Sequence, residues 1–355
     1  MYKARKGNLL MLIIAVMGIL GSLLIAVVGK LAPQILSFLR SDIGTIVLLG
    51  ITDFVFLGVP IGAYILFKRR PLKEIFRFNK LSVIDAMLVA ASAILFLPTV
   101  SILGTITSIF SNNDVGEMVT SISSMPTLVM LFSVAVLPAI FEELALRGIA
   151  LSEYRNKSIV TAVLMNGLLF SLFHLNIQQS LYTFAMGAIM ALIVIYTDSI
   201  FSSMVFHFVV NGINVIMAKI SIFILEHTDP SMMDSTNAKV ETNAATIISF
   251  AFFGIIAMSF LVGGILVVIL IRNRNRDKWV GKYPPFRMKP ANKWFKKDAD
   301  LDKKSLNSTD EQSDKEYRRV FRRQKRAQRI VDVTLILNIV IYIAYTLIMT
   351  EQITL

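Results

Sequence analysis

The fold class can be read from one apolar run, residues 127–151, whose sequence is TLVMLFSVAVLPAIFEELALRGIAL. A helix rises about 1.5 Å per residue, so a run of this length can cross the ~30 Å hydrocarbon core of a bilayer. Three ionisable residues nevertheless stand towards its end, namely Glu142, Glu143 and Arg147. Charged side chains are costly in a bilayer, and those found there usually pair or perform chemistry. The run therefore predicts a membrane-spanning helix that carries a polar site.

Eight further apolar runs lie on either side of this one. They cover residues 9–29, 43–67, 83–108, 158–178, 180–198, 200–225, 245–271 and 332–350. The chain is 55% hydrophobic and 17% charged, with a mean hydropathy of +0.66, whereas soluble domains hold about 25% charged residues. The sequence therefore predicts an all-α, polytopic transmembrane helical bundle of about eight or nine spans with a polar intramembrane cavity.

All of the excess positive charge lies in one segment. Residues 272–330 hold 20 Lys or Arg and 8 Asp or Glu, and their net charge of +12 equals that of the whole chain. With nine spans, this segment shares one side of the membrane with the basic clusters at residues 3–6, 68–80 and 147–157, and the positive-inside rule makes that side cytoplasmic. We predict a multi-pass plasma-membrane protein with a cytoplasmic amino terminus. Because the segment borders the membrane, we expect it to bind anionic lipid and expect no nucleic acid partner.

Helix geometry separates the two adjacent glutamates. Glu143 and Arg147 are four residues apart, so they share a helix face and are predicted to form a supporting ion pair. Glu142 is turned by about 100° from Glu143 and remains available for chemistry.

Two other runs carry polar stripes at helical spacing. Asn166 and His174 lie on one face of the run at 158–178, and the later run at 200–225 carries His207, Asn211 and Asn214 on one face. Three helices are therefore expected to direct polar side chains into one cavity. On uninterrupted helices, however, His174 stands near the opposite end of its span, displaced by up to ~15 Å in depth from the other polar groups.

These residue types suit hydrolysis of an amide bond. A carboxylate and a histidine can together orient and deprotonate water, while a second histidine and an asparagine amide can stabilise an oxyanion. The chain has no cysteine, and no serine stands in a nucleophile elbow, so attack by water is favoured over a covalent intermediate. A catalytic zinc held by Glu142, His174 and His207 is the alternative.

The same residues resemble the motifs of a known family. The three motifs are Glu142-Glu143-x-x-x-Arg147-Gly148, Phe170-x-x-x-His174 and His207-x-x-x-Asn211. Their types, order and spacing are similar to those of the CPBP (CAAX protease and bacteriocin-processing) intramembrane proteases, also called the Abi or type II CAAX prenyl endopeptidase family. The resemblance covers about residues 125–216. One departure is Leu146 before Arg147, where the family commonly has phenylalanine.

The resemblance implies a helical fold around a cavity open to the cytosol, and proteolysis by glutamate-activated water. The implied roles are activation of water by Glu142 with His174, stabilisation of the oxyanion by His207 and Asn211, and support of the site by Glu143 and Arg147. Family members are often described as metallopeptidases, but these residues need no metal, so we expect no cofactor.

We therefore predict an intramembrane endopeptidase that hydrolyses a peptide bond near the membrane interface of a membrane-associated peptide or protein. The resemblance does not establish that the substrate is prenylated. A non-catalytic scaffold or bacteriocin self-immunity protein is the main alternative. A transporter that relays ions through Asp53 and Glu142 is less favoured. The expected segments are N-terminal helices (1–124), a catalytic core (125–226), an outer loop and helix (227–271), the basic cytoplasmic loop (272–330) and a C-terminal helix (331–355).

Overall fold

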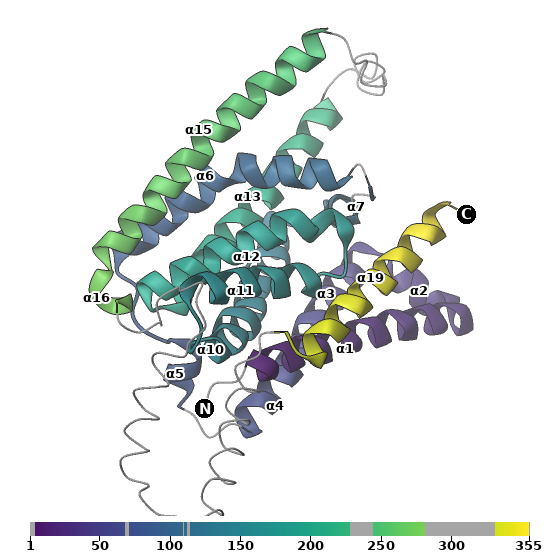
Figure 1. Ribbon diagram of the computed structural model, residues 1–355. Helices are drawn as coiled ribbons and strands as arrows, with labels where there is room; N and C mark the ends of the chain where they lie inside the picture. Colours follow the sequence, from purple (N-terminus) through teal and green to yellow (C-terminus); the bar gives the residue numbers. More distant parts are fainter. Residues whose placement is uncertain are drawn as a thin grey trace, which may run out of the picture.

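The computed structural model describes residues 4–67, 71–108, 110–111, 114–227, 244–280 and 331–354, and all secondary structure in them is helical (Figure 1). The amino-terminal half comprises α1 (Ala4–Leu31), α2 (Pro33–Leu39), α3 (Asp42–Ile51), η1 (Thr52–Gly58), α4 (Val59–Phe67), α5 (Leu72–Phe76), α6 (Val83–Ser108) and α7 (Asp114–Ser121). The remainder comprises α8 (Thr127–Met130), η2 (Leu131–Val136), α9 (Leu137–Glu143), η3 (Leu144–Ala150), α10 (Leu151–Glu153), α11 (Ile159–Phe173), α12 (Ile177–Thr197), α13 (Ile200–His227), α15 (Ala244–Arg274), α16 (Arg276–Trp279) and α19 (Val333–Thr354).

The predicted all-α, polytopic architecture is confirmed, and each of the nine apolar runs corresponds to a helix or a series of helices. Seven helical stretches in the described residues are long and apolar enough to cross a membrane. The other two, Ile159–Phe173 and Val333–Ile348, are shorter. Most of the segment 272–330, where lipid binding is predicted, lies outside the described residues.

The predicted boundary between the fifth and sixth runs is wrong, and the reason is a local chain reversal. Helix α11 ends at Phe173 rather than at residue 178, and Leu175 takes a left-handed φ of 49°, which is uncommon for a residue other than glycine. Asn176 then caps α12 by accepting a hydrogen bond from Gln179 N at 3.2 Å. His174 follows the last residue of α11 as its C-cap and is not followed by further helix.

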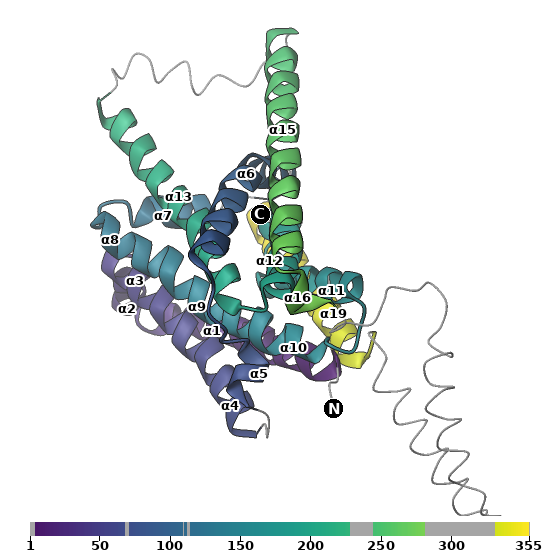
Figure 2. The same cartoon turned by 90° about the vertical axis from the view of Figure 1, so that its left-hand side faces the viewer.

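Three stretches of wider, π-type helical turns interrupt the spans beside the polar residues. Segment η1 holds Asp53, η2 immediately precedes α9, and η3 holds Arg147. Such turns are rare and occur often at functional sites. In Figure 2 the series α8, α9 and α10 runs beside α3 and α4, and contacts between η1 and α9 join the two series.

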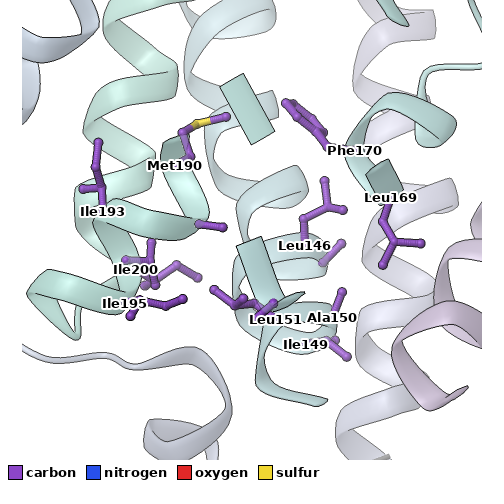
Figure 3. Packing of buried hydrophobic residues seen from close by; sticks show 14 of the residues in the cluster. Leu146, Ile149, Ala150, Leu151, Leu169, Phe170, Met190, Ile193, Ile195 and Ile200 are labelled. Atoms are coloured by element: carbon purple, nitrogen blue, oxygen red, sulfur yellow. The ribbon is translucent and has the colours of Figure 1, made fainter. Parts of the chain in front are cut away.

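The main hydrophobic core surrounds η3 and holds the polar motif in place. Figure 3 shows side chains of η3 and α10 facing those of α11, α12 and α13. The labelled residues are Leu146, Ile149, Ala150, Leu151, Leu169, Phe170, Met190, Ile193, Ile195 and Ile200. Because these side chains come from separate helices, the core fixes the relative positions of the elements that carry the candidate site.

Polar contacts attach the helices near the two ends of the chain to this core. Helix α19 lies beside α1 (Figure 1), and Asn338 Nδ2 donates to the Asn8 backbone carbonyl at 2.9 Å. The Tyr154 hydroxyl donates to Asn8 Oδ1 at 2.6 Å. At the other side of the bundle, Asp85 on α6 accepts from Asn275 at 2.9 Å next to the end of α15, so this carboxylate serves a structural contact.

The close contact between α11 and α12 yields a prediction about stability. A Cβ atom on Gly167 would stand 2.7 Å from the Phe184 carbonyl oxygen, and backbone cannot move away as a flexible side chain does. We expect Gly167→Ala to lower the free energy of unfolding by about 1–3 kcal/mol, as overpacking does. Thermal unfolding of the purified protein in detergent measures the change.

Gly254→Ala is the matched control, because a Cβ at Gly254 on α15 meets nothing within 4 Å. This variant should unfold at the wild-type temperature or slightly above it, since alanine favours helix over glycine. Equal destabilisation by both substitutions would contradict the packing argument.

Candidate active site

The residues predicted to be catalytic converge on one cavity of about 1030 Å³ in the described part of the chain. Glu142 on α9, His174 at the end of α11, and His207 and Asn211 on α13 all line it. Residues of α1, η1, α6, α12 and α19 complete the wall. We call this space the polar cavity. Polar residues that are up to 69 positions apart in the sequence, from 142 to 211, therefore line the same cavity.

Glu143 is the centre of a fully buried charge cluster behind the cavity wall. Its Oε1 atom lies 2.8 Å from Arg147 Nη1, and both side chains have no exposed surface. The same oxygen lies 2.9 Å from His207 Nδ1. The Arg147 guanidinium also lies over the Phe170 ring, 4.3 Å from its centroid. Neither Glu143 nor Arg147 lines the polar cavity. Their contacts instead connect α9, η3, α11 and α13 to one another.

His207 links the two adjacent glutamates. A carboxylate can only accept a hydrogen bond, so His207 Nδ1 donates to Glu143. The opposite ring nitrogen, Nε2, then faces the cavity and lies 3.8 Å from Glu142 Oε2. In the described residues this Glu142 oxygen is buried and makes no hydrogen bond. Glu142 is therefore the glutamate whose carboxylate remains open to a ligand.

His174 has a fixed orientation at the end of α11. Its Nδ1 atom lies 2.8 Å from the Phe170 carbonyl oxygen, which can only accept, so Nδ1 carries a hydrogen and the neutral ring leaves Nε2 with a free electron pair. The ring packs edge-on against Phe170 and Phe173, at centroid distances of 4.8 and 5.0 Å. The arrangement leaves His174 able to accept a proton in the cavity.

Asn211 is oriented by the irregular backbone of η2. Its Nδ2 atom donates to the Val134 carbonyl oxygen at 3.0 Å. Pro138 has no N–H, so it cannot donate to that carbonyl in the usual i→i−4 pattern. Pro138 thus leaves the Val134 carbonyl oxygen available to accept from the Asn211 side-chain amide on α13. The second Nδ2 hydrogen of Asn211 remains for other partners.

The two predicted polar stripes differ in outcome. Asn214 lines the polar cavity together with His207 and Asn211. Asn166, however, is not among the lining residues of the cavity; it is fully buried, and its Nδ2 donates to the Leu146 carbonyl oxygen at 2.9 Å. Asn166 therefore supports the backbone of η3 instead of facing the site.

The alternative zinc site would use Glu142, His174 and His207 as its ligands. In the described part of the chain, no group of three or more His, Asp or Glu side chains is placed to hold a metal ion. The cavity brings these side chains to one space without forming a ligand set.

Asp53 lines the polar cavity as well, although it was predicted to act only in the less favoured transporter alternative. Its position in an apolar run was the signal that could have pointed to the site, since charges in such runs are usually functional. Tyr345 and Thr346 of α19 also line the cavity and carried no comparable signal.

Comparison with known proteins supports the family that the motifs suggest. Residues 124–213 match the family model described as type II CAAX prenyl endopeptidase Rce1-like. The match contains every predicted site residue, from Glu142 to Asn211, and it covers 90 of the 355 residues. No curated protein and no solved structure gives a significant match to the chain.

The buried charge cluster yields a prediction about Arg147. Arg147→Met leaves the Glu143 carboxylate buried without its cationic partner, and breaking a buried pair typically costs 3–5 kcal/mol. We expect a loss of this size in unfolding free energy, measured by chemical denaturation in detergent micelles.

Arg155→Met is the control for this variant. Arg155 lies 3.8 Å from Glu74, and both side chains are partly exposed. Partly exposed pairs contribute about 1 kcal/mol or less. A similar small loss for Arg147→Met would show that the Glu143 cluster is not a structural support.

Proposed function

Because residues 124–213 carry the CPBP/CAAX protease family signature, we propose that this multi-pass membrane protein is an intramembrane endopeptidase that hydrolyses a peptide bond near the membrane interface. The observation that carries the proposal is the convergence of Glu142, His174, His207 and Asn211 on one cavity within an otherwise apolar bundle. The substrate class is a membrane-associated peptide or protein.

In the first step, a water molecule in the cavity attacks the carbonyl carbon of the scissile bond. Glu142 takes a proton from this water, with the free Nε2 of His174 as the second group that orients it. The open Glu142 oxygen supports this role, because it makes no hydrogen bond within the described residues and Glu142 lines the polar cavity, whereas Glu143 does not. The carbonyl electron pair moves onto oxygen and creates an oxyanion.

His207 and Asn211 are proposed to stabilise this oxyanion. The free Nδ2 hydrogen of Asn211 donates to it. In its protonated form His207 can donate to the oxyanion from Nε2, the ring nitrogen opposite the one bonded to Glu143. Collapse of the intermediate breaks the C–N bond, and Glu142 returns its proton to the leaving amine. The products are a carboxylic acid and an amine, Glu142 is again a carboxylate, and the charges balance; the new acid then loses its proton to water.

A metal-independent reaction follows from the residues alone, since every step uses side chains already at the cavity. We expect the purified enzyme to retain its rate after treatment with EDTA or 1,10-phenanthroline. Loss of activity that added Zn²⁺ restores would overturn this part of the proposal and favour a zinc enzyme.

The decisive test compares new peptide termini in host membranes by mass spectrometry. A deletion strain is complemented with the wild type or with Glu142→Gln at native level. We expect the same termini to be lost in the deletion and in Glu142→Gln, because general-base catalysis supplies about 10²–10⁴-fold in rate. Glu142→Gln should remain folded, since in the described residues Glu142 pairs with no lysine or arginine and its one ion-pair contact, with His207, is long at 3.8 Å.

Glu74→Gln serves as the control, because Glu74 is a partly exposed carboxylate outside the polar cavity. It should restore all termini. If Glu142→Gln rescues a deletion phenotype with no change in termini, the scaffold or self-immunity alternative replaces the protease. Ion flux across sealed vesicles that depends on Glu142 would instead identify a transporter.

We further propose that the amino terminus is cytoplasmic and that residues 272–330 contact anionic lipid of the plasma membrane. Support for both comes from the charge distribution of the sequence, in which the whole excess of +12 lies in that segment.

A further inference from the structure

We propose that Asp53 forms a subsite in the wall of the polar cavity for a positively charged group of the substrate, a lysine or arginine side chain next to the scissile bond. The inference rests on the proposed function and specifies its substrate class. It assigns a role to a cavity-lining carboxylate that, among the described residues, the proposed mechanism leaves unused.

Asp53 is a buried carboxylate with an unusual lack of partners. Only 6% of its surface is exposed, and it makes no hydrogen bond or ion pair within the described residues. Three other buried carboxylates in the described residues each have at least one polar partner. Asp85 accepts from Asn275 at 2.9 Å, and Glu143 pairs with Arg147 at 2.8 Å. Glu153 accepts from the Tyr64 hydroxyl at 2.6 Å. A buried charge without a partner is costly, so the unsatisfied Asp53 points to a ligand from outside the chain.

The composition of the cavity wall indicates the charge of that ligand. Among the described residues that line the polar cavity, Asp53 and Glu142 are acidic and none is lysine or arginine. The remaining wall is apolar, hydroxyl or amide in character, apart from the two histidines. The two acidic side chains would offset the cost of burying a cationic group in this cavity, whereas they would repel an anionic group. The ligand is therefore a cation.

The position of Asp53 relative to Glu142 indicates where in the substrate the cation lies. Phe54 and Phe141, the neighbours of these two acids, pack edge-on with ring centroids 4.7 Å apart. This contact attaches η1 to α9 and keeps the two carboxylates on the same part of the wall. Because Glu142 is proposed to act at the scissile bond, the subsite lies within a few residues of that bond.

The π-type turn of η1 explains how Asp53 reaches the cavity. The segment Thr52–Gly58 lies inside an apolar span between α3 and α4. Pro60 follows it and cannot donate to the Phe56 carbonyl in the usual helical pattern. The wider turn therefore interrupts the regular span at the acidic residue, as such turns do at functional sites.

The test measures a ratio of kcat/KM values on the full-length protein in liposomes. Peptides based on an identified cleavage site carry either Lys or Gln at each position within three residues of the scissile bond. We expect wild type to cleave the best Lys peptide at least about tenfold more efficiently than its Gln counterpart, as expected for a desolvated charge pair. Acetylated and free peptide amino termini show whether the cation is a side chain or a terminal amine.

Variants of Asp53 assign the preference to this residue. Asp53→Asn should bring the ratio close to one, and Asp53→Glu should retain a preference for Lys. Asp198→Asn is the control, because Asp198 lies outside the polar cavity and 3.5 Å from Arg77. It should keep the wild-type ratio.

The outcomes separate this inference from the proposed function. Cleavage by wild type that depends on Glu142 but shows no preference for Lys overturns the subsite and leaves the protease intact. A preference for Lys that persists in Asp53→Asn also overturns it. Absence of any Glu142-dependent cleavage overturns both. If Asp53→Asn does not fold, the wild-type ratio still decides, because a value near one is incompatible with the subsite.

Discussion

The structure depends on one buried cluster, in which the Glu143 carboxylate lies between Arg147 and His207. Charges removed from water are stable only when they are paired and hydrogen-bonded, and both contacts to Glu143 Oε1 are shorter than 3 Å. The cluster joins α9, η3 and α13, and Arg147 extends it to α11 through Phe170. It also leaves Glu142, the adjacent residue, on the cavity side of the same helix. Separation of a buried, paired carboxylate from a cavity-lining carboxylate thus follows from the helical turn between two neighbouring residues.

Departures from regular helical backbone position several of the side chains at or near the cavity. Pro138 leaves the Val134 carbonyl available to Asn211, and the left-handed Leu175 ends α11 so that His174 faces the cavity. The π-type turns at η1 and η3 carry Asp53 and Arg147. In a bilayer, freed backbone groups persist only where other protein groups satisfy them or a cavity is present. The deviations therefore gather around the cavity.

The wall of the polar cavity includes residues outside the segment that matches the family model. The matched residues 124–213 supply the four proposed catalytic side chains, but α1, η1, α6 and α19 contribute much of the wall. Helix α19 is held against α1 by Asn8 and Asn338. In the proposed function, chemistry and substrate recognition are divided between different parts of the chain, with the proposed cation subsite at Asp53 in the second part.

The sequence by itself determined the helical class, the membrane setting and the types of residue available for chemistry. Apolar runs of bilayer length have few alternatives to helix, and the i, i+4 spacing of Glu143 and Arg147 brings them together on any helix. Tertiary structure alone decided that His174 ends a helix, that Asn166 supports Leu146 instead of facing the cavity, and that Asp53 joins Glu142. These outcomes depend on packing between helices far apart in sequence, and helical periodicity carries no information about which faces meet.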